Sequence, residues 1–382
     1  MKRFAAIAAL SLCPLAAAAL PLPDPPQLPA KSYLLYDYDS GQALAAKEPT
    51  LRVEPASLTK VMLAYVAFDE IKQGRVKLTD EALVSEKAWR QGMDSKESRM
   101  FIEVGKRVAV GDLLHGIVVQ SGNDASVALA EHLGGTEETF ADLMNRYARQ
   151  LGMTQTHFAN ATGVPAPGQY TTARDMALLG RALIRDFPEQ YALFKQREFI
   201  FNKIRQPNRN KLLWRDESVD GIKTGHAEKP GYHLLASAQR NGRRLITVVL
   251  GSDGENARAE QSLALLNYGF RFYETAPVAE AGKPVLTIRA WKGAEKELAL
   301  GLARPLVVSV PHGAGGRLQL QPEAAGPVHA PVAAGQALGT LKVMLDGKVV
   351  REEPLVALAA LPEGNLWRRL ADGVQLWMQD AF

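Results

Sequence analysis

The sequence predicts an α/β domain, an antiparallel sheet flanked by helices with an inserted helical subdomain, followed by a small all-β domain and a C-terminal amphipathic helix. Two observations predict the α/β domain: strand-like runs stand at both of its ends, and helical patterns fill the stretch between them. A third observation separates the remainder, because near Pro277 the chain changes to short strand-like runs joined by turn residues.

Composition limits the classes of function that the chain can have. Its 382 residues allow two or three domains, and 47% hydrophobic content is ordinary for a globular protein. The formal net charge of +4 is mild, and no dense basic stripe is present, which argues against nucleic-acid binding. The seven histidines lack the spacing of metal ligands, so we expect neither a metal nor a cofactor.

Residues 1–19 have the pattern of a secretory signal peptide. Lys2 and Arg3 form the positive start, an apolar run follows, and residues 17–19 offer a small-residue cleavage site. The alternative is an uncleaved membrane helix, but the apolar run is too short to span a bilayer. The single cysteine, Cys13, lies in this segment, and its neighbours Leu12 and Pro14 do not match the residues expected around a lipoprotein cysteine. The mature chain would therefore contain no cysteine and no disulfide. We therefore expect a periplasmic protein.

A proline-rich lead-in at residues 20–29 precedes the α/β domain, which we expect over residues 30–275. Its strands are indicated by apolar or alternating runs bounded by turn residues. These runs fall at residues 32–38, 42–47, 220–224, 232–238 and 244–251. Asn241-Gly242 should join the last two strands, because this dipeptide is the strongest short hairpin signal.

Helical spacing of apolar residues fills the middle of the domain. Helices are expected from about Pro55 to Gly74 and at residues 110–119, 124–133, 136–151, 172–185 and 257–273. Thr136 suits the N-cap of its helix, and Glu137 and Glu138 place negative charge in the first turn.

Residues 276–361 predict the all-β domain, in which no catalytic constellation is visible. Its strands are expected at residues 285–290, 297–302, 306–310, 318–321, 341–345 and 348–351.

The tail, residues 362–382, predicts an amphipathic helix. Its apolar stripe consists of Leu366, Trp367, Leu370, Val374, Trp377 and Met378. The charged residues between them argue against a spanning helix and for one that lies in the membrane interface. Two tryptophans in the stripe favour peripheral anchoring to the outer face of the inner membrane. The alternative is a terminal helix docked on the chain's own β-domain.

Three short motifs carry the candidate chemistry. Ser57 and Lys60 are three residues apart at a helix start, so their hydroxyl and amine should lie side by side. A hydroxyl becomes a nucleophile when a base takes its proton, and desolvation or nearby positive charge can lower a lysine pKa enough for that role. Ser121-Gly122-Asn123 falls in an interhelical turn, and Lys223-Thr224-Gly225 falls on a strand facing the Ser57 helix. We expect all three motifs to surround one cleft.

These motifs, in this order, resemble the set found in penicillin-binding proteins and class A β-lactamases. The whole chain resembles low-molecular-mass penicillin-binding proteins of the D-alanyl-D-alanine carboxypeptidase type, also in its order of segments. Further similar stretches are Asn123-Asp124-Ala125, Ala173-Arg174-Asp175-Met176, the run from Asp220 to His226, and Gly269-Phe270-Arg271-Phe272. The resemblance implies a β-lactamase/transpeptidase-like fold and a serine peptidase that removes the terminal D-alanine from peptidoglycan stem peptides. It also implies that β-lactams acylate the same serine.

The resemblance and side-chain chemistry together assign roles around the nucleophile. Ser57 would attack the penultimate D-alanine carbonyl, and Lys60 would accept its proton, kept neutral more often by the Lys223 ammonium. Ser121 would relay a proton to the departing amine, and Asn123 would orient Lys60 and the substrate amide.

The other motif residues would bind the substrate. Lys223 and Thr224 would hold its terminal carboxylate, and Gly225 would let the peptide approach the strand edge. Backbone N–H groups of Ser57 and His226 would form the oxyanion hole.

Two further residues are candidates for substrate binding. Arg258 matches a second carboxylate contact, for which the two-pronged guanidinium is suited, although a solvated helix arginine is the alternative. Ser98 would sit in a loop over the site, with an ordinary loop serine as the alternative.

Rival functions remain open at this point. A β-lactamase would share the fold but needs a carboxylate in a loop to direct water, and no convincing motif lies between Asn123 and Lys223. A non-catalytic penicillin-binding sensor or scaffold would use the pocket for binding alone, against which the complete catalytic set argues. An endopeptidase that cuts cross-links is a nearer relative, which the sequence excludes only weakly.

Overall fold

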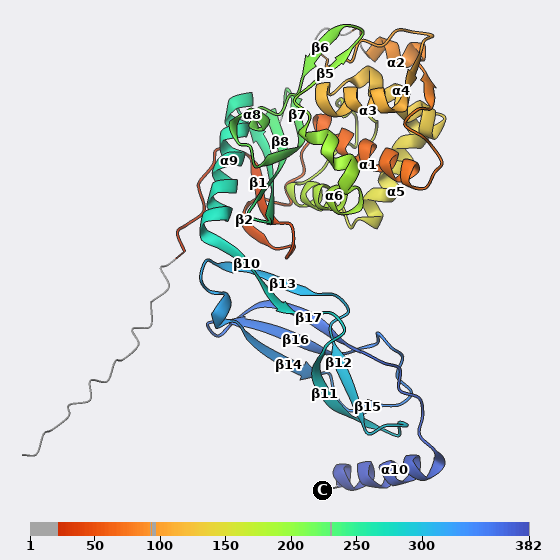
Figure 1. Ribbon diagram of the computed structural model, residues 1–382, viewed down its shortest axis with the longest axis vertical. Helices are drawn as coiled ribbons and strands as arrows, with labels where there is room; N and C mark the ends of the chain where they lie inside the picture. The colour runs from red at the N-terminus through yellow and green to blue at the C-terminus, as the bar shows by residue number, and fades with distance from the viewer. Residues whose placement is uncertain (1–21, 92, 94–96, 230, 382) are drawn as a thin grey trace, which may run out of the picture.

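The computed structural model describes residues 22–91, 93, 97–229 and 231–381. The predicted signal peptide at residues 1–19, with Cys13, lies outside the described residues. The α/β domain, the all-β domain and the terminal helix follow one another along the long axis of the molecule (Figure 1). The predicted fold class is therefore confirmed.

A five-stranded antiparallel sheet with the order β2-β1-β9-β8-β7 forms the centre of the α/β domain. Its strands are β1 (Ser32–Asp37), β2 (Ala43–Lys47), β7 (Val219–Ala227), β8 (Gly231–Arg240) and β9 (Arg243–Ser252). Strands far apart in sequence thus pair directly, and β7, which carries the third motif, is an edge strand. An edge strand has backbone groups that no neighbouring strand occupies, so it can pair with an extended peptide.

Successive side chains of β1 point to opposite faces of this sheet, as strand geometry requires. Leu34 and Tyr36 join the core shared with the inserted helices, whereas Tyr33 and Leu35 join the core beneath α9 (Glu255–Phe272). Figure 1 shows α9 on one side of the sheet and the helical subdomain on the other.

The inserted subdomain consists of helices and two short hairpins. The helices are α1 (Thr59–Lys72), α2 (Glu86–Gln91), α3 (Val110–His115), α4 (Asn123–Gly134), α5 (Glu137–Gln150), α6 (Ala173–Asp186) and α7 (Pro188–Tyr191). The short helix α8 (Leu212–Arg215) instead packs beside α9 on the other side of the sheet. The hairpins are β3 (Glu81–Leu83) with β4 (Arg107–Ala109), and β5 (Glu198–Phe201) with β6 (Ile204–Pro207). The predicted cap of α5 is confirmed, since the Thr136 side chain accepts a hydrogen bond from the Thr139 backbone N–H.

Helix α1 is buried on more sides than an amphipathic helix with one apolar face would be. Its residues from Thr59 to Phe68 are all buried, so neighbouring helices cover every side of its first turns. A helix that is enclosed in this way positions its side chains against packed neighbours on all sides, which restricts the rotamers of any functional group on it.

The all-β domain contains a six-stranded sheet with the order β14-β16-β17-β12-β11-β15 and a separate pair, β10 with β13. The strands are β10 (Tyr273–Ala279), β11 (Pro284–Trp291), β12 (Glu297–Gly301), β13 (Leu306–Pro311), β14 (Gln319–Ala324), β15 (Val328–His329), β16 (Ala337–Leu345) and β17 (Lys348–Ala357). Strand β10 begins directly after α9, so the boundary expected at residues 275 and 276 falls inside this strand.

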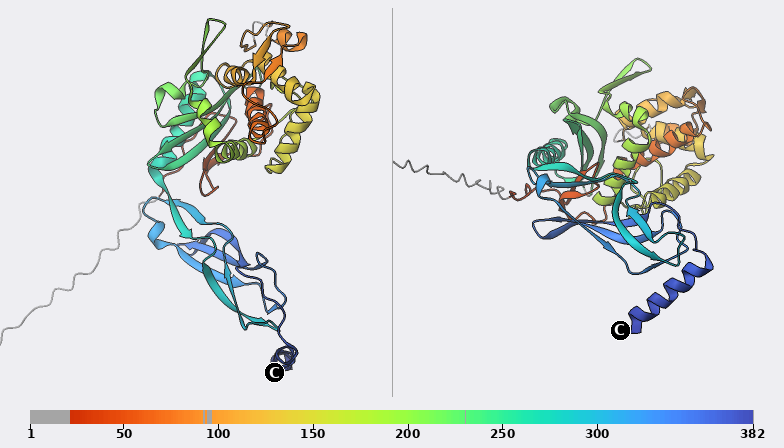
Figure 2. Two further views of the ribbon diagram at one scale, coloured as in Figure 1. Left: turned by 45° about the vertical axis from the view of Figure 1, so that its right-hand side comes forward. Right: turned by 60° about the horizontal axis from the view of Figure 1, so that its bottom comes forward.

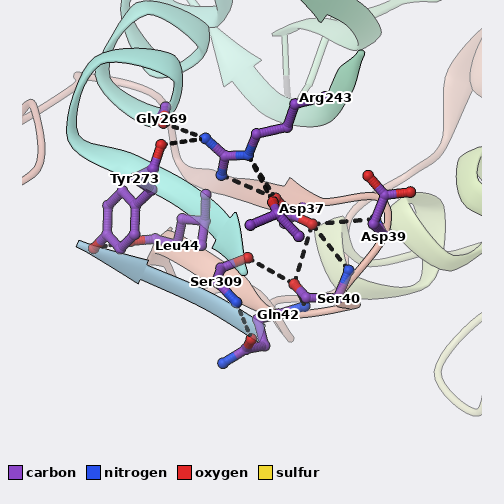
Figure 3. Close-up of polar contacts among 10 residues, drawn as sticks. Asp37, Asp39, Ser40, Gln42, Leu44, Arg243, Gly269, Tyr273 and Ser309 are labelled. Carbon is purple, nitrogen blue, oxygen red and sulfur yellow. Dashed lines mark hydrogen bonds and ion pairs between the residues drawn. The ribbon is translucent and has the colours of Figure 1, made fainter. Parts of the chain in front are cut away.

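Buried polar contacts join the two domains (Figure 3). Asp37 is fully buried, and its carboxylate accepts hydrogen bonds from Arg243 at 2.9 and 3.0 Å and from the Thr275 hydroxyl at 2.8 Å. The Ser40 and Ser309 hydroxyls lie 2.7 Å apart across the same junction. These contacts involve strands of both domains, so they stabilise one relative orientation.

The terminal helix α10 (Leu366–Ala381) lies at the end of the all-β domain remote from the α/β domain (Figures 1 and 2). Its polar side meets the β-domain: Asp372 accepts a hydrogen bond from the Lys292 backbone N–H at 2.6 Å, and Arg289 donates to Gln375 at 2.7 Å. The apolar stripe is exposed, with Trp367 81% and Trp377 69% accessible. No helix in the described part of the chain is both long and apolar enough to cross a membrane.

Candidate active site

Ser57 lies in a single 3₁₀ turn, Ala56–Leu58, that leads directly into the buried helix α1. Ala56 has a φ of +48°, in the left-handed region that residues with a side chain rarely adopt. The loop at Gly163 approaches this turn so closely that a Cβ there would lie 1.9 Å from the Ala56 carbonyl oxygen. The turn is therefore held in a strained conformation by packing, an arrangement that is common at functional sites.

Lys60 is 1% exposed, and its Nζ is in contact with three oxygens. It lies 2.9 Å from Ser57 Oγ, 2.7 Å from Asn123 Oδ1 and 2.6 Å from the Thr162 carbonyl oxygen. The first two motifs are thus joined by direct hydrogen bonds.

Burial lowers the pKa of Lys60 to about 7, although the negative charges of Glu97 and Asp124 oppose this shift. A neutral amine has two N–H groups and one lone pair. The Asn123 and Thr162 oxygens can only accept, so they take the two N–H groups. The lone pair then faces the Ser57 hydroxyl, which becomes the donor. This geometry suits Lys60 as the base that removes the Ser57 proton.

The second motif begins at the end of a π-helical turn, Gly116–Gln120, a distortion that is frequent at functional sites. Ser121 follows with a φ of +69°, and its Oγ is buried without a hydrogen-bond partner in the described chain. A buried hydroxyl without a partner is costly, so this group is available to a bound molecule. Asn123 starts α4, and its backbone N–H donates to the Ser98 carbonyl at 2.8 Å.

The third motif lies on the edge strand β7, beside the nucleophile turn. A Cβ at Gly225 would lie 3.2 Å from the Pro55 carbonyl oxygen and 3.3 Å from the Ala56 Cβ, so glycine permits this close approach. Lys223 is 2% exposed, and its pKa is well below its usual range because of burial first and then the positive charges of Lys60 and Arg258. For Lys60, burial and not the Lys223 charge is the main cause of the lowered pKa.

Arg258 and His226 lie at the same end of β7. Arg258 is 4% exposed and donates to the Gly225 carbonyl at 2.9 Å, while burial lowers its pKa to about 10. It is therefore not the solvated arginine considered as an alternative. The His226 ring is stacked on Tyr232, with a distance of 4.2 Å between the ring centroids.

These segments surround a cleft of about 970 Å³. Of the residues expected at the site, the cleft is lined by Ser57, Ser98, Ser121, Thr224, Gly225, His226 and Arg258. Lys60, Asn123 and Lys223 are buried beside it. A second cavity, of about 930 Å³, lies at the junction of the two domains and is lined by none of the motif residues.

Sequence reasoning missed several groups at the site. The Thr162 carbonyl contacts Lys60 through its backbone, which has no signature in the sequence. Asp124 accepts hydrogen bonds from the backbone N–H groups of Met100 at 2.8 Å and Phe101 at 2.9 Å, which anchors the segment that carries Ser98. Glu97 accepts a hydrogen bond of 2.6 Å from Asn123 Nδ2 and lines the cleft. The sequence offered one indication of this role, because Glu97 directly precedes Ser98, which was expected in a loop over the site.

Comparison with known proteins gives matches over nearly the whole chain. Residues 21–254 match a family described as D-alanyl-D-alanine carboxypeptidase, and residues 273–363 match the C-terminal domain of penicillin-binding protein 5. Among curated relatives, D-alanyl-D-alanine carboxypeptidase DacC of Escherichia coli (strain K12) is 43% identical, covering 95% of this chain and 92% of the relative. DacA of the same organism is 42% identical, covering 94% of this chain and 91% of the relative.

Solved structures show the same likeness. Penicillin-binding protein 5 from Haemophilus influenzae superimposes with a TM-score of 0.86 at 41% identity, covering 89% of this chain and 99% of the other.

Proposed function

Because this chain belongs to the D-alanyl-D-alanine carboxypeptidase family of penicillin-binding proteins, we propose that it acts through an acyl-enzyme on Ser57. Family membership confirms the predicted activity, a carboxypeptidase acting on peptidoglycan. The observation that carries the assignment to Ser57 is the hydrogen-bonded set of Ser57, Lys60 and Asn123. β-Lactams acylate the same hydroxyl in this proposal.

In the first half of the reaction, neutral Lys60 takes the Ser57 proton as Ser57 Oγ bonds to the penultimate D-alanine carbonyl carbon. The carbonyl electron pair moves to its oxygen, and the backbone N–H groups of Ser57 and His226 stabilise that charge. The electron pair then returns from the oxygen to re-form the carbonyl, and the carbon–nitrogen bond breaks. The departing amine takes the proton that Lys60 accepted. Ser121 relays this proton, a role supported by its buried hydroxyl without a partner in the described chain.

In the second half, water replaces the amine. Lys60 takes a proton from the water molecule while the water oxygen bonds to the acyl carbon. The ester bond between that carbon and Ser57 Oγ then breaks. The same proton then returns to Ser57, so the enzyme is restored and the shortened peptide leaves with a new carboxyl group.

The terminal carboxylate of the substrate meets Lys223 and Thr224. A carboxylate beside Lys223 favours its ammonium form, which burial and the neighbouring cations otherwise oppose. The Arg258 guanidinium, which donates a hydrogen bond to the Gly225 carbonyl, adds positive charge that attracts the substrate carboxylate. Ser98, at the rim of the cleft, contributes a further polar contact to the bound peptide.

Release of free D-alanine from a stem pentapeptide tests this proposal. We expect release by the wild type and none by Ser57→Ala. Release at the wild-type rate by Ser57→Ala would remove Ser57 from the mechanism.

The rate of acylation is expected to rise with pH up to about 7 and then level off. The reason is that the neutral Lys60 amine is the active form, so the rate falls about tenfold for each pH unit below its pKa. The second-order rate constant for a fluorescent penicillin measures this directly, with tryptophan fluorescence to check that the protein stays folded. A rate independent of pH in this range would exclude Lys60 as the base.

The exposed stripe of α10 supports peripheral attachment of this periplasmic protein to the outer face of the inner membrane. The stripe presents two exposed tryptophans, while the polar side of α10 is occupied by the β-domain. The α/β domain lies at the opposite end of the molecule (Figure 1). In this proposal, its cleft therefore lies away from the bilayer surface.

Flotation with vesicles of phosphatidylethanolamine and phosphatidylglycerol tests this attachment. We expect the wild type to float and a Trp367→Glu/Trp377→Glu variant to stay in the dense fraction, because both side chains would carry charge into the interface. Leu320→Glu is the matched control, since Leu320 is an exposed apolar residue of the β-domain outside the stripe. Equal flotation of all three proteins would contradict the attachment.

A further inference from the structure

Glu97 is a charged residue at the rim of the cleft that the steps above do not use. We propose that Glu97 is a positioning residue for acylation: it fixes the Asn123 amide in the free enzyme and competes with substrate for the same N–H donor. The proposal rests on the proposed function, because it concerns how Ser57 becomes acylated.

The hydrogen-bonding of Glu97 determines which way the Asn123 amide points. A carboxylate only accepts, so the Asn123 Nδ2 must face Glu97, from which it lies 2.6 Å away. The amide oxygen is then directed to Lys60 Nζ at 2.7 Å. The opposite orientation would set the amide oxygen against a carboxylate and the amide N–H groups against the lysine amine. Glu97 therefore acts on Lys60 and Ser57 through a continuous series of hydrogen bonds.

The negative charge of Glu97 has a second effect, on the protonation of Lys60. The Lys60 ammonium is favoured by the carboxylates of Glu97 and Asp124, and burial opposes both. The positive charges of Lys60, Arg258 and Arg209 lower the pKa of the neighbouring Lys223, in addition to the larger effect of burial. Asp124 is held by backbone N–H groups of Met100 and Phe101 inside the protein. Glu97 instead lines the cleft, where an entering molecule can reach it.

Substrate entry therefore changes the state of the base. If the amide carbonyl of the bound peptide takes the particular Asn123 N–H that points to Glu97, the hydrogen bond to Glu97 must break. The carboxylate then moves away from Asn123, and the Lys60 ammonium loses a negative neighbour. Loss of that neighbour lowers the pKa of Lys60 and leaves more neutral amine at the moment when Ser57 must lose its proton.

Glu97→Gln and Glu97→Ala separate this proposal from a structural role. Gln keeps an oxygen that can accept from Asn123 but has no charge, whereas Ala removes both. The pH dependence of Ser57 acylation by a fluorescent penicillin is the measurement. We expect the rise in rate to move to lower pH by about one unit in both variants, so that Glu97→Gln reacts about tenfold faster than the wild type at acid pH. In Glu97→Ala, which also loses the acceptor that fixes the Asn123 amide, the plateau rate above pH 7 should fall as well.

Glu103→Gln is the matched control. It removes the same charge from the same segment, but Glu103 is exposed and does not line the cleft. Its profile should coincide with that of the wild type.

The outcomes distinguish this inference from the function on which it rests. Profiles of Glu97→Gln and Glu97→Ala that coincide with the wild type, or move to higher pH, overturn the inference alone. Absence of acylation in the wild type overturns the proposed function and the inference with it. The two Glu97 variants are independent, so either one carries the test if the other fails to fold.

Discussion

Lys60→Arg is expected to lower the rate of Ser57 acylation by about 10³-fold. Arginine keeps a positive charge and several N–H donors for the Asn123 and Thr162 oxygens, but its pKa is too high for it to accept a proton near neutral pH. Lys60→Met should be equally slow, because it has no basic nitrogen at all. The comparison isolates proton transfer from charge, since only the first variant keeps a cation beside Ser57.

Stopped-flow acylation by a fluorescent penicillin measures both variants. Met leaves the buried Asn123 and Thr162 oxygens without a donor, so its thermal unfolding midpoint should fall, and the rate must be measured well below that midpoint. A Lys60→Arg rate within tenfold of the wild type would show that another group takes the Ser57 proton.

Gly163→Ala is expected to lower the acylation rate by about 10²-fold, because displacement of a reacting group by about 1 Å can have that cost. The added Cβ would lie 1.9 Å from the Ala56 carbonyl oxygen, so the nucleophile turn or the Gly163 loop must shift. Gly163 also has a φ of +86°, which disfavours any side chain.

Gly168→Ala is the control for this substitution. Gly168 belongs to the same loop region and has a φ of +77°, but nothing lies within 4 Å of its Cβ position. Both variants therefore carry similar backbone strain, and only Gly163→Ala collides with the nucleophile turn. Equal acylation rates for the two variants would mean that the position of this turn does not depend on Gly163.

The sequence could predict those parts of the site that depend on short-range spacing. The separation of Ser57 and Lys60 corresponds to one helical turn, and the structure has their side chains 2.9 Å apart. It could not predict the Thr162 carbonyl or the left-handed Ala56, because both result from chain packing and not from side-chain identity. The link from Glu97 to Asn123 was missed for a similar reason: it joins segments that only the fold brings together.

The fold shows the same division between local and long-range information. The Asn241-Gly242 turn and the strands beside it were predicted because their signals are local. Strand β10 was missed because Pro277, which lies within it, indicated a break in structure. Proline is tolerated there because β10 pairs with β13 alone, so its other edge needs no backbone N–H donors. Helix α1 was predicted from apolar spacing, but the burial of its first ten residues on every side depends on distant helices.

The reactivity of Ser57 is the claim on which the whole account depends, and intact mass spectrometry after incubation with penicillin tests it most directly. We predict one penicilloyl adduct that maps to Ser57, persists for many minutes and is absent from Ser57→Ala. An adduct on a different residue, or none on the folded wild-type protein, would contradict the account.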